Sequence, residues 1–416
     1  MTVSFPDSHP NGDRLLAILL LATLDTKGPE AAFVRNRFLA AGFSVLCVDA
    51  GVVGEPAFAP DLPRETIWEA AGTRLRDVRA LGDRGKAIAV AARGAAILAA
   101  KLHREGRIDA VFGLGGSAGT AIACSAMQVL PYGLPKVMVS TMASGNVGPY
   151  VGIRDIAMFH SVVDLCGLNR FSRAMLAQAA NAFIGMLRSP VVPEVADKPL
   201  LAATMFGVTT PCVSAARDIL EADGYEMLVF HATGSGGRTM EAMIRDRLIS
   251  GVLDITTTEL ADQLVGGIMP AGDERLTAAA IRGVPQAISV GALDMVNFGP
   301  RDTVPAKFEG RRFHEHNPTI TLMRTTPEEN DTLGREIAEK ACAASGPTAV
   351  VLPMRGISAL DIEGGPFWWP EADAALFQSL RNWLTMDVEL IEADLHINDP
   401  KFARLCADVL LKMLRS

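Results

Sequence analysis

The segment GLGGSAGT, residues 113–120, places four glycines and two hydroxyl side chains between an apolar run and an Ala-rich stretch. Glycines let backbone N–H groups approach oxygen atoms closely, and the N-terminus of a helix favours an anion. The segment therefore predicts a phosphate site made by Gly115, Gly116, Ser117, Gly119 and Thr120. Its spacing matches neither G-x-G-x-x-G nor the Walker A loop, and a tight strand-to-helix turn is the structural alternative.

The same residues contain GGSAG (115–119), which matches the G-x-S-x-G nucleophile elbow in the required strand–turn–helix context. Ser117 is then a candidate nucleophile, with His160 and Asp164 as candidate partners. Their order along the chain is not the usual Ser, Asp, His order of that fold. A serine hydrolase is therefore an alternative hypothesis.

Three more groups of polar residues follow apolar runs in the N-terminal half. They are expected at the carboxyl ends of strands, which is where ligands bind in open parallel sheets. In the first, Asp25 or Thr26 is expected to cap a helix while Lys27 counters a phosphate charge; a capped helix with a solvated lysine is the alternative. Asp49 ends the second run and can accept from ribose hydroxyls, or it is only a loop acid. The third group comprises Thr141, Ser144, Gly145 and Asn146.

The C-terminal half holds a second glycine-rich loop, HATGSGG (231–237), followed by Arg238. An arginine there can grip a phosphate or carboxylate through two parallel hydrogen bonds. Two such loops, one in each half, suggest a ligand in the cleft between two domains.

Two further segments carry candidate catalytic residues. His314 and His316 could bind a metal, but no third ligand is evident, and hydrogen-bonding histidines are the more frequent reading. Arg355 and Asp361 lie in a glycine-rich segment followed by two tryptophans, which is typical of a substrate pocket or of an ordered surface loop. With Arg238, these four residues form the predicted catalytic set.

Short apolar runs alternate with helical patterns along the whole chain, which predicts α/β architecture: two Rossmann-like domains with mainly parallel sheets and helices on both faces. A proline-rich stretch predicts a linker at 191–199, between a nucleotide-binding domain at 1–190 and a second α/β domain at 200–416. We expect one strand at 286–299 and an irregular segment at 300–318.

Composition excludes several classes of protein. The 416 residues have a net charge of -8 without a Lys/Arg block, so no nucleic-acid partner is expected. The N-terminus lacks a signal-peptide pattern, and the apolar run at 15–24 is too short for a membrane span of about 20 residues. Six scattered cysteines argue against disulfides and thiolate zinc, which favours the cytoplasm.

Six motifs, in order along nearly the whole chain, together resemble the Tm-one-like ATP-binding domain family: LATLDTKG (21–28), GLGGSAGT (113–120), VSTMASGN (139–146), HATGSGG (231–237), HEHNP (314–318) and LPMRGISALDIEGGPF (352–367). The resemblance implies a nucleotide site in the first of two α/β domains, self-association as a homodimer, and nucleotide contacts from 25–27, 115–120 and 144–146. It implies no particular reaction. Plant members carry an additional barrel domain that this chain lacks, so no antiviral role is carried over.

The leading hypothesis is an ATP-binding enzyme acting on an unidentified small molecule, with Mg²⁺ as a further candidate cofactor and no membrane partner. A nucleotide-sensing module without turnover and the serine hydrolase are the alternatives.

Overall fold

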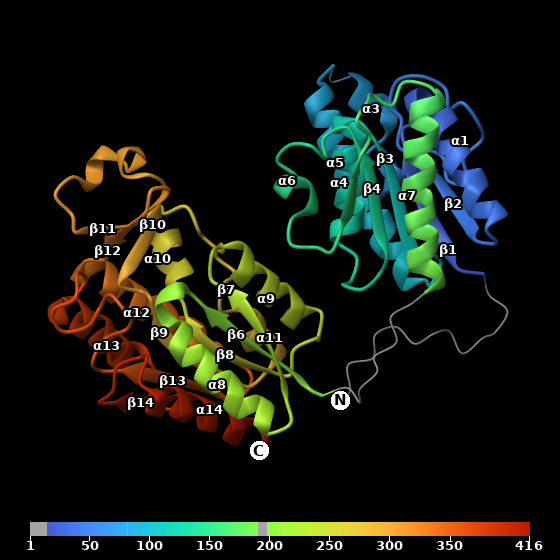
Figure 1. Cartoon of the computed structure of the whole chain (residues 1–416). Helices are drawn as coiled ribbons and strands as arrows, with labels where there is room; N and C mark the ends of the chain where they lie inside the picture. Colours follow the sequence, from blue (N-terminus) through green and yellow to red (C-terminus); the bar gives the residue numbers. More distant parts are fainter. Residues whose placement is uncertain (1–14, 81, 190–197) are drawn as a thin grey trace. The chain divides into compact units, whose positions relative to one another are not determined.

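The computed structural model describes residues 15–80, 82–189 and 198–416. The chain divides into two compact units, residues 4–194 and 195–416, whose described parts are called domain one and domain two below. Most of the predicted linker, residues 191–197, lies outside the described residues. Figure 1 shows a parallel sheet with flanking helices in each domain.

Domain one is built on sheet A, whose five strands run parallel in the order β2-β1-β3-β4-β5. The strands are β1 (Ala17–Ala22), β2 (Ser44–Asp49), β3 (Ala110–Gly115), β4 (Lys136–Ser140) and β5 (Ala157–His160). The central strand β3 is buried along its whole length. Strands covered on both faces read as continuous apolar runs, which is why the sequence pattern located them.

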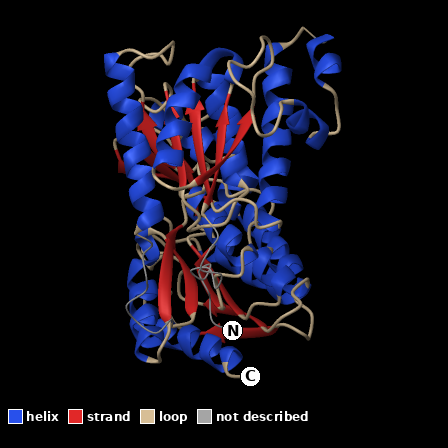
Figure 2. Ribbon diagram, turned by 90° about the vertical axis from the view of Figure 1, so that its right-hand side faces the viewer, coloured by secondary structure: helices blue, strands red, loops and turns tan. Residues whose placement is uncertain are grey.

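Helices cover both faces of sheet A (Figure 2). One face packs against α1 (Leu24–Ala40) and α7 (Arg170–Arg188) through an aromatic group of Phe38, Phe112 and Phe183, with ring centroids 5.2 to 5.5 Å apart. The other face packs against α4 (Arg84–Arg104) and α5 (Ser117–Gln128), with α2 (Glu65–Ala70) and α3 (Leu75–Ala80) beside α4. A short helix, α6 (Gly148–Val151), follows β4.

Domain two is built on sheet B, six parallel strands in the order β14-β13-β9-β8-β6-β7. Its strands are β6 (Leu200–Met205), β7 (Glu226–His231), β8 (Gly251–Thr256), β9 (Gln286–Gly291), β13 (Thr348–Pro353) and β14 (Glu389–Ala393). Alternate residues of one strand face opposite layers: Leu201 and Ala203 join one core, and Ala202 joins another.

Two helices, α8 (Thr210–Ala222) and α14 (Pro400–Leu414), cover one face of sheet B. The opposite face is covered by α9 (Ser235–Arg245), α10 (Thr258–Val265), α11 (Ala278–Arg282), α12 (Pro327–Cys342) and α13 (Pro370–Trp383). The predicted fold class is confirmed by this layering of helices on two parallel sheets.

The prediction of one strand at 286–299 is wrong. The chain leaves sheet B after Gly291, turns at Ala292 with φ of 58°, and re-enters a second sheet as β10 (Met295–Phe298). Sheet C is antiparallel, in the order β10-β12-β11, with β11 (Phe313–Asn317) and β12 (Ile320–Arg324). The two strands that replace the single predicted strand, β9 and β10, are buried at every residue. The apolar pattern of the sequence therefore did not reveal the break between them. The segment predicted as irregular contains β11 and two 3-10 turns, Arg301–Thr303 and Ala306–Phe308.

In the ranges that the structure describes, no helix is both long and apolar enough to cross a membrane.

Candidate functional site

The strand order of sheet A changes direction between β1 and β3. From β1 the chain moves outward to β2, then returns past β1 to β3, β4 and β5. Open parallel sheets bind ligands outside the carboxyl ends of the strands at this switch point. Residues Thr23–Lys27, after β1, and Gly116–Thr120, after β3, therefore occupy the usual ligand position of the fold.

Helix α5 opens toward this position without a side-chain cap. Its N-cap is Gly116, and the first intrahelical bond is donated by the Thr120 amide to the Gly116 carbonyl at 2.8 Å. Within the described part of the chain, the amides of Ser117, Ala118 and Gly119 have no acceptor. Ser117 is exposed. Three free amides at the start of a twelve-residue helix are an arrangement that favours an anion, because helix dipole and N–H groups act together.

The glycines of the loop have two different roles. A Cβ on Gly113 would lie 2.6 Å from that of Ala123, and one on Gly115 would lie 2.8 Å from the Gly119 Cα. These glycines are needed for close packing of β3 against α5. A Cβ on Gly116 would meet only the Thr141 Oγ1, at 3.7 Å. A tight strand-to-helix turn, the structural alternative to a phosphate site, therefore explains Gly113 and Gly115. Gly116, by contrast, borders open space at the helix start.

Thr120 supports the loop from beneath. It is fully buried, and its hydroxyl donates to the Gly116 carbonyl at 2.8 Å and pairs with the Ser140 hydroxyl at 2.6 Å. Ser140 Oγ accepts the Met142 amide at 2.9 Å. Both hydroxyls are thus used within the protein. Thr120 positions the loops after β3 and β4, and the predicted direct contact with a ligand is replaced by this role.

Asp25 does not cap the helix as predicted, because α1 already begins at Leu24 with Thr23 as N-cap. Its Oδ2 accepts the amides of Val53 and Gly54, at 3.0 and 3.2 Å, and so fixes the loop after β2. Its Oδ1 is buried and has no hydrogen-bond partner in the described structure. Thr26 is exposed, and its hydroxyl lies 2.8 Å from that of Thr23.

Asp49 is enclosed. Its Oδ1 accepts the amides of Leu24 and Gly51, and its Oδ2 contacts Arg64 Nε at 2.8 Å and Nη2 at 2.7 Å. The side chain is 1% exposed. Three hydrogen bonds and the second arginine nitrogen surround the buried carboxylate, so it is closed to ribose hydroxyls. The residue instead joins the ends of β1 and β2.

Lys27 and the loop after β4 both lie at the carboxyl edge of sheet A. The Lys27 ammonium donates to the Leu165 carbonyl and lies 3.9 Å from Asp164 Oδ1, with 15% of its side chain exposed. Thr141 is half-buried, and its amide donates to the Gly115 carbonyl at 3.3 Å. Ser144, Gly145 and Asn146 are exposed. The loops after β1, β3 and β4 are thus the ones that adjoin the free amides of α5.

The hydrolase arrangement is not formed. His160 ends β5, and β4 separates that strand from β3. Asp164 lies beside Lys27. Among the residues that the structure describes, Ser117 makes no hydrogen bond to a histidine, so the nucleophile–base pair of a triad is not seen.

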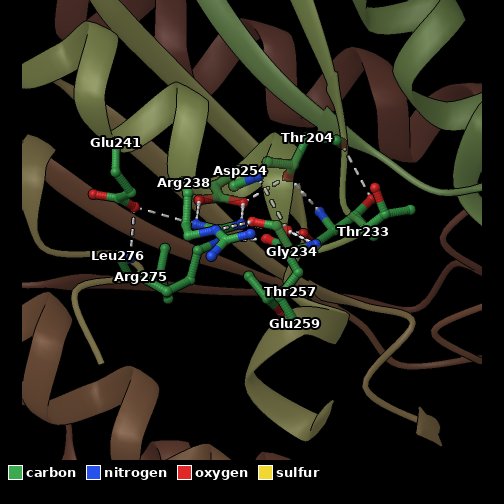
Figure 3. A network of polar contacts seen from close by, with 12 residues as sticks. Thr204, Thr233, Gly234, Arg238, Glu241, Asp254, Thr257, Glu259, Arg275 and Leu276 are labelled. Carbon is green, nitrogen blue, oxygen red and sulfur yellow. Dashed lines mark hydrogen bonds and ion pairs between the residues drawn. The ribbon is translucent and has the colours of Figure 1, made fainter. Parts of the chain in front are cut away.

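The glycine-rich loop of domain two differs from its counterpart, because a carboxylate of the protein itself occupies it (Figure 3). Glu259 Oε1 accepts the Gly234 amide at 2.7 Å and the Gly237 amide at 3.0 Å. A Cβ on Gly237 would lie 2.1 Å from Glu259 Oε2, which accounts for that glycine. The prediction of a second phosphate loop is therefore corrected: its anion is Glu259.

Arg275 connects Glu259 to two more carboxylates (Figure 3). Its guanidinium contacts Asp254 through two nitrogens, at 2.5 and 2.7 Å, Glu259 at 2.7 Å and Glu241 at 3.5 Å. All four side chains are nearly or fully buried. Burial raises the pKa of Glu241, although Arg275 opposes the shift. This network was not predicted; its signal in the sequence is an acid inside the threonine-rich run that follows an apolar strand.

The candidate catalytic residues of domain two are not brought together. Arg238 follows β7 at one edge of sheet B and donates to the Gly234 carbonyl at 3.2 Å. Arg355 follows β13, four inter-strand steps away, each of about 4.8 Å. His314 and His316 lie on β11 of sheet C, where a bulge follows Glu315. No group of three metal-ligating side chains occurs among the residues described, those on β11 included.

Arg355 and Asp361 share a loop but not an environment. Arg355 is exposed and makes a two-point ion pair with Asp394, at 2.7 Å for both contacts. Asp361 is completely buried. Its Oδ2 accepts the Ile357 amide at 2.9 Å, which folds the loop back on itself. A group so enclosed cannot touch a substrate in this conformation.

Both halves of the chain match models of one protein family. Residues 16–191 match the N-terminal domain of the uncharacterised protein family UPF0261, and residues 198–414 match its C-terminal domain.

Similar proteins come from bacteria and a plant. A UPF0261 protein of Clostridium tetani is 47% identical over 95% of this chain and 98% of its own length. The ToMV resistance protein Tm-1(GCR237) of Solanum lycopersicum is 45% identical over 79% of this chain and 45% of its own length. Among solved structures, a UDP-N-acetylglucosamine 2-epimerase from Rickettsia bellii is 9% identical, with a TM-score of 0.24 over 66% of this chain and 79% of that one.

Proposed function

We propose, for a chain that belongs through both halves to the uncharacterised protein family UPF0261, that domain one binds ATP at the carboxyl edge of sheet A. The membership and the similarity to the tomato protein confirm the family resemblance predicted from the sequence. The observation that carries the proposal is the open N-terminus of α5 at the switch point, with three amides free to meet phosphate oxygens.

Contrast with domain two strengthens the assignment. Both loops combine a strand, glycines and a helix, yet Glu259 neutralises the amides of one loop and nothing in the described structure neutralises those of the other. An anion from outside is therefore needed only in domain one. Lys27 lies at the same edge and supplies a positive charge close to the polyphosphate.

The residues also suit Mg²⁺ as a companion of the nucleotide. Asp25 Oδ1 is a buried carboxylate oxygen without a donor, and hydroxyls of Thr23 and Thr26 lie on the same turn. Oxygen ligands of this kind are those that Mg²⁺ prefers. Asp25 and Thr26 would hold the ion, which when bound neutralises phosphate charge.

We propose an enzyme of small-molecule metabolism as the first function and a nucleotide-sensing module without turnover as the second. The second is favoured by the dispersal of Arg238, His316 and Arg355 over sheets B and C. The family resemblance implies a homodimer, and an unidentified small-molecule substrate belongs to the enzyme hypothesis. The six free cysteines fit a reducing compartment, which supports the cytoplasm.

Nucleotide titration of purified protein tests the site. ATP and ADP, with and without Mg²⁺, are titrated by calorimetry into wild type and Ser117→Glu. The glutamate places a negative charge at the first residue of α5, where it stabilises the helix by about 0.3–1 kcal/mol but repels phosphate. We expect affinity to fall by about 100-fold, or about 2.7 kcal/mol.

Two control variants interpret the result. Ser117→Ala removes only the hydroxyl and should change affinity by less than about fivefold, or about 1 kcal/mol. Ser235→Glu makes the same charge change at the start of α9, whose loop already holds Glu259, and should leave ATP affinity unchanged. Wild type without measurable binding of ATP or ADP would refute the proposal. ATP hydrolysis or transfer in the presence of metabolite extracts separates the first function from the second.

A further inference from the structure

A second cluster of buried acids lies where sheets B and C meet. Asp294 comes from the turn between β9 and β10, Asp361 from the loop after β13, and Asp373 from α13. Arg324, at the end of β12, is the cation among them. Asp294, Asp361 and Arg324 have no exposed surface, and Asp373 is 5% exposed. Three carboxylates against one guanidinium leave excess negative charge in the core of domain two.

The single cation is engaged mainly by one acid. Arg324 Nη2 donates to Asp373 Oδ1 at 2.6 Å and lies 3.9 Å from Asp361 Oδ1, and its Nε donates to the Phe367 carbonyl. Among the described residues, Asp294 forms no ion pair with an arginine, and its Oδ2 accepts the Ser358 hydroxyl at 2.7 Å. A charge on Asp294 is therefore the least compensated of the three.

Each of these two acids has an oxygen without a donor. Asp294 Oδ1 and Asp361 Oδ1 are both buried without a hydrogen-bond partner in the described structure. Ser358 links the pair, since its hydroxyl donates to Asp294 and accepts the Asp361 amide at 3.2 Å. A negative charge on Asp294 in such a position is repelled by Asp361 and loses hydration, whereas a proton held by Asp294 removes both costs.

We propose that Asp294, buried against Asp361, holds a proton in the folded protein, and that loss of this proton to water releases the loop of residues 355–365 from the edge of sheet B. The loop is anchored beside Asp294: Ile357 and Leu360 donate their amides to Asp361 Oδ2 and Ser358 Oγ, at 2.9 and 3.0 Å. Ionisation of Asp294 is tolerated once the loop opens, because water then reaches its carboxylate.

Burial supports the proposal, since it raises the pKa of Asp294 to about 7, with Asp361 adding to the shift and Arg324 opposing it. The sign follows from linkage: an acid that is protonated when closed and ionised when open makes opening easier as pH rises. The window runs from the ordinary aspartate pKa of about 4 to the raised value of about 7. Within it, opening should become tenfold more frequent per pH unit.

Two other titratable groups lie near the loop. Burial raises the pKa of Asp373 to about 8, although Arg324, which pairs with it directly, opposes the shift; in the described structure Asp373 accepts no amide of the loop. His396, after β14, accepts the Asn398 amide at Nδ1, so its Nε2 carries the proton and donates to the Ser358 carbonyl at 2.9 Å.

Hydrogen exchange of the full-length protein between pH 5 and 7 tests the inference. After correction for base-catalysed intrinsic exchange, protection of the amides of residues 357, 360 and 361 should fall by about 100-fold across this range. Amides in α14, on the opposite face of sheet B, should keep constant protection. Asp294→Asn, which is neutral at every pH, should abolish the fall, and Asp387→Asn, an exposed control, should not.

The wild-type measurement decides the matter even if Asp294→Asn folds poorly. Protection that is constant with pH, or that rises with pH, overturns the inference. A fall shared equally by the loop and by α14 would also overturn it, because it would report global unfolding and no release of the loop.

Discussion

At the scale of single residues, the chemistry of a polar group in this protein depends on what already contacts it. Asp49 and Thr120 have the right type and position for ligand contacts, but Arg64, Ser140 and backbone groups use all their hydrogen-bonding capacity. Gly116 and Ser117 have open surroundings and free amides. The site is therefore made mostly of backbone, with Asp25 and Lys27 as its charged side chains.

Glu259 gives a prediction at this scale. Glu259→Gln keeps the size of the side chain but places an amide N–H₂ or a neutral oxygen against Arg275, leaving that guanidinium with less compensation. Breaking a buried ion pair in this way should lower the free energy of unfolding of domain two by about 3 kcal/mol or more. Urea denaturation followed by far-UV circular dichroism measures the change.

The matched control is Glu274→Gln. Glu274 pairs with Arg245 at 2.9 Å, but its side chain is 76% exposed and that of Arg245 38%, so the loss should stay below about 1 kcal/mol. Equal losses in the two variants would mean that burial of the Arg275 network adds nothing to stability.

At the scale of elements, close approach of helices and strands decides where glycine is required. Gly94 of α4 faces the end of α2, where an added Cβ would lie 2.0 Å from the Ile67 carbonyl oxygen. Gly185 of α7 has no atom within 4 Å of such a Cβ, among those described. The two glycines look alike in helical sequence patterns, yet only Gly94 is needed for packing.

Alanine substitutions should therefore have opposite signs. Gly94→Ala forces α2 and α4 apart and should cost about 1–3 kcal/mol of unfolding free energy. Gly185→Ala should stabilise domain one by about 0.5–1 kcal/mol, since alanine loses less backbone entropy in a helix. Thermal unfolding of both variants measures the two shifts; a stabilised Gly94→Ala protein would contradict the packing argument.

At the scale of the whole molecule, each domain has its own parallel sheet and its own buried cores on both faces of that sheet. Every residue of the proposed nucleotide site lies in domain one. Self-contained cores of this size are expected to fold independently.

Separate expression tests this independence. Residues 15–190 and 198–416 should each give cooperative unfolding and dispersed amide NMR spectra, and the first fragment should bind ATP within about tenfold of the full chain, or about 1.4 kcal/mol. A first fragment that folds but fails to bind would place essential ligand contacts outside domain one.

The sequence by itself determined most of the buried parallel strands and the loops at their ends. Apolar runs buried on both faces are continuous in sequence, so β1, β3, β6 and β13 were visible without a structure. The break at Ala292 was not visible, because a buried turn between two buried strands leaves the apolar pattern intact.

Only the tertiary structure decided which glycine-rich loop is free to bind an anion. GLGGSAGT and HATGSGG are similar in composition and in their place between strand and helix. Glu259, more than twenty positions along the chain from Gly234, fills the second loop and leaves the first open. Such a contact depends on how strands are ordered in a sheet, and local patterns of residues carry no record of that order.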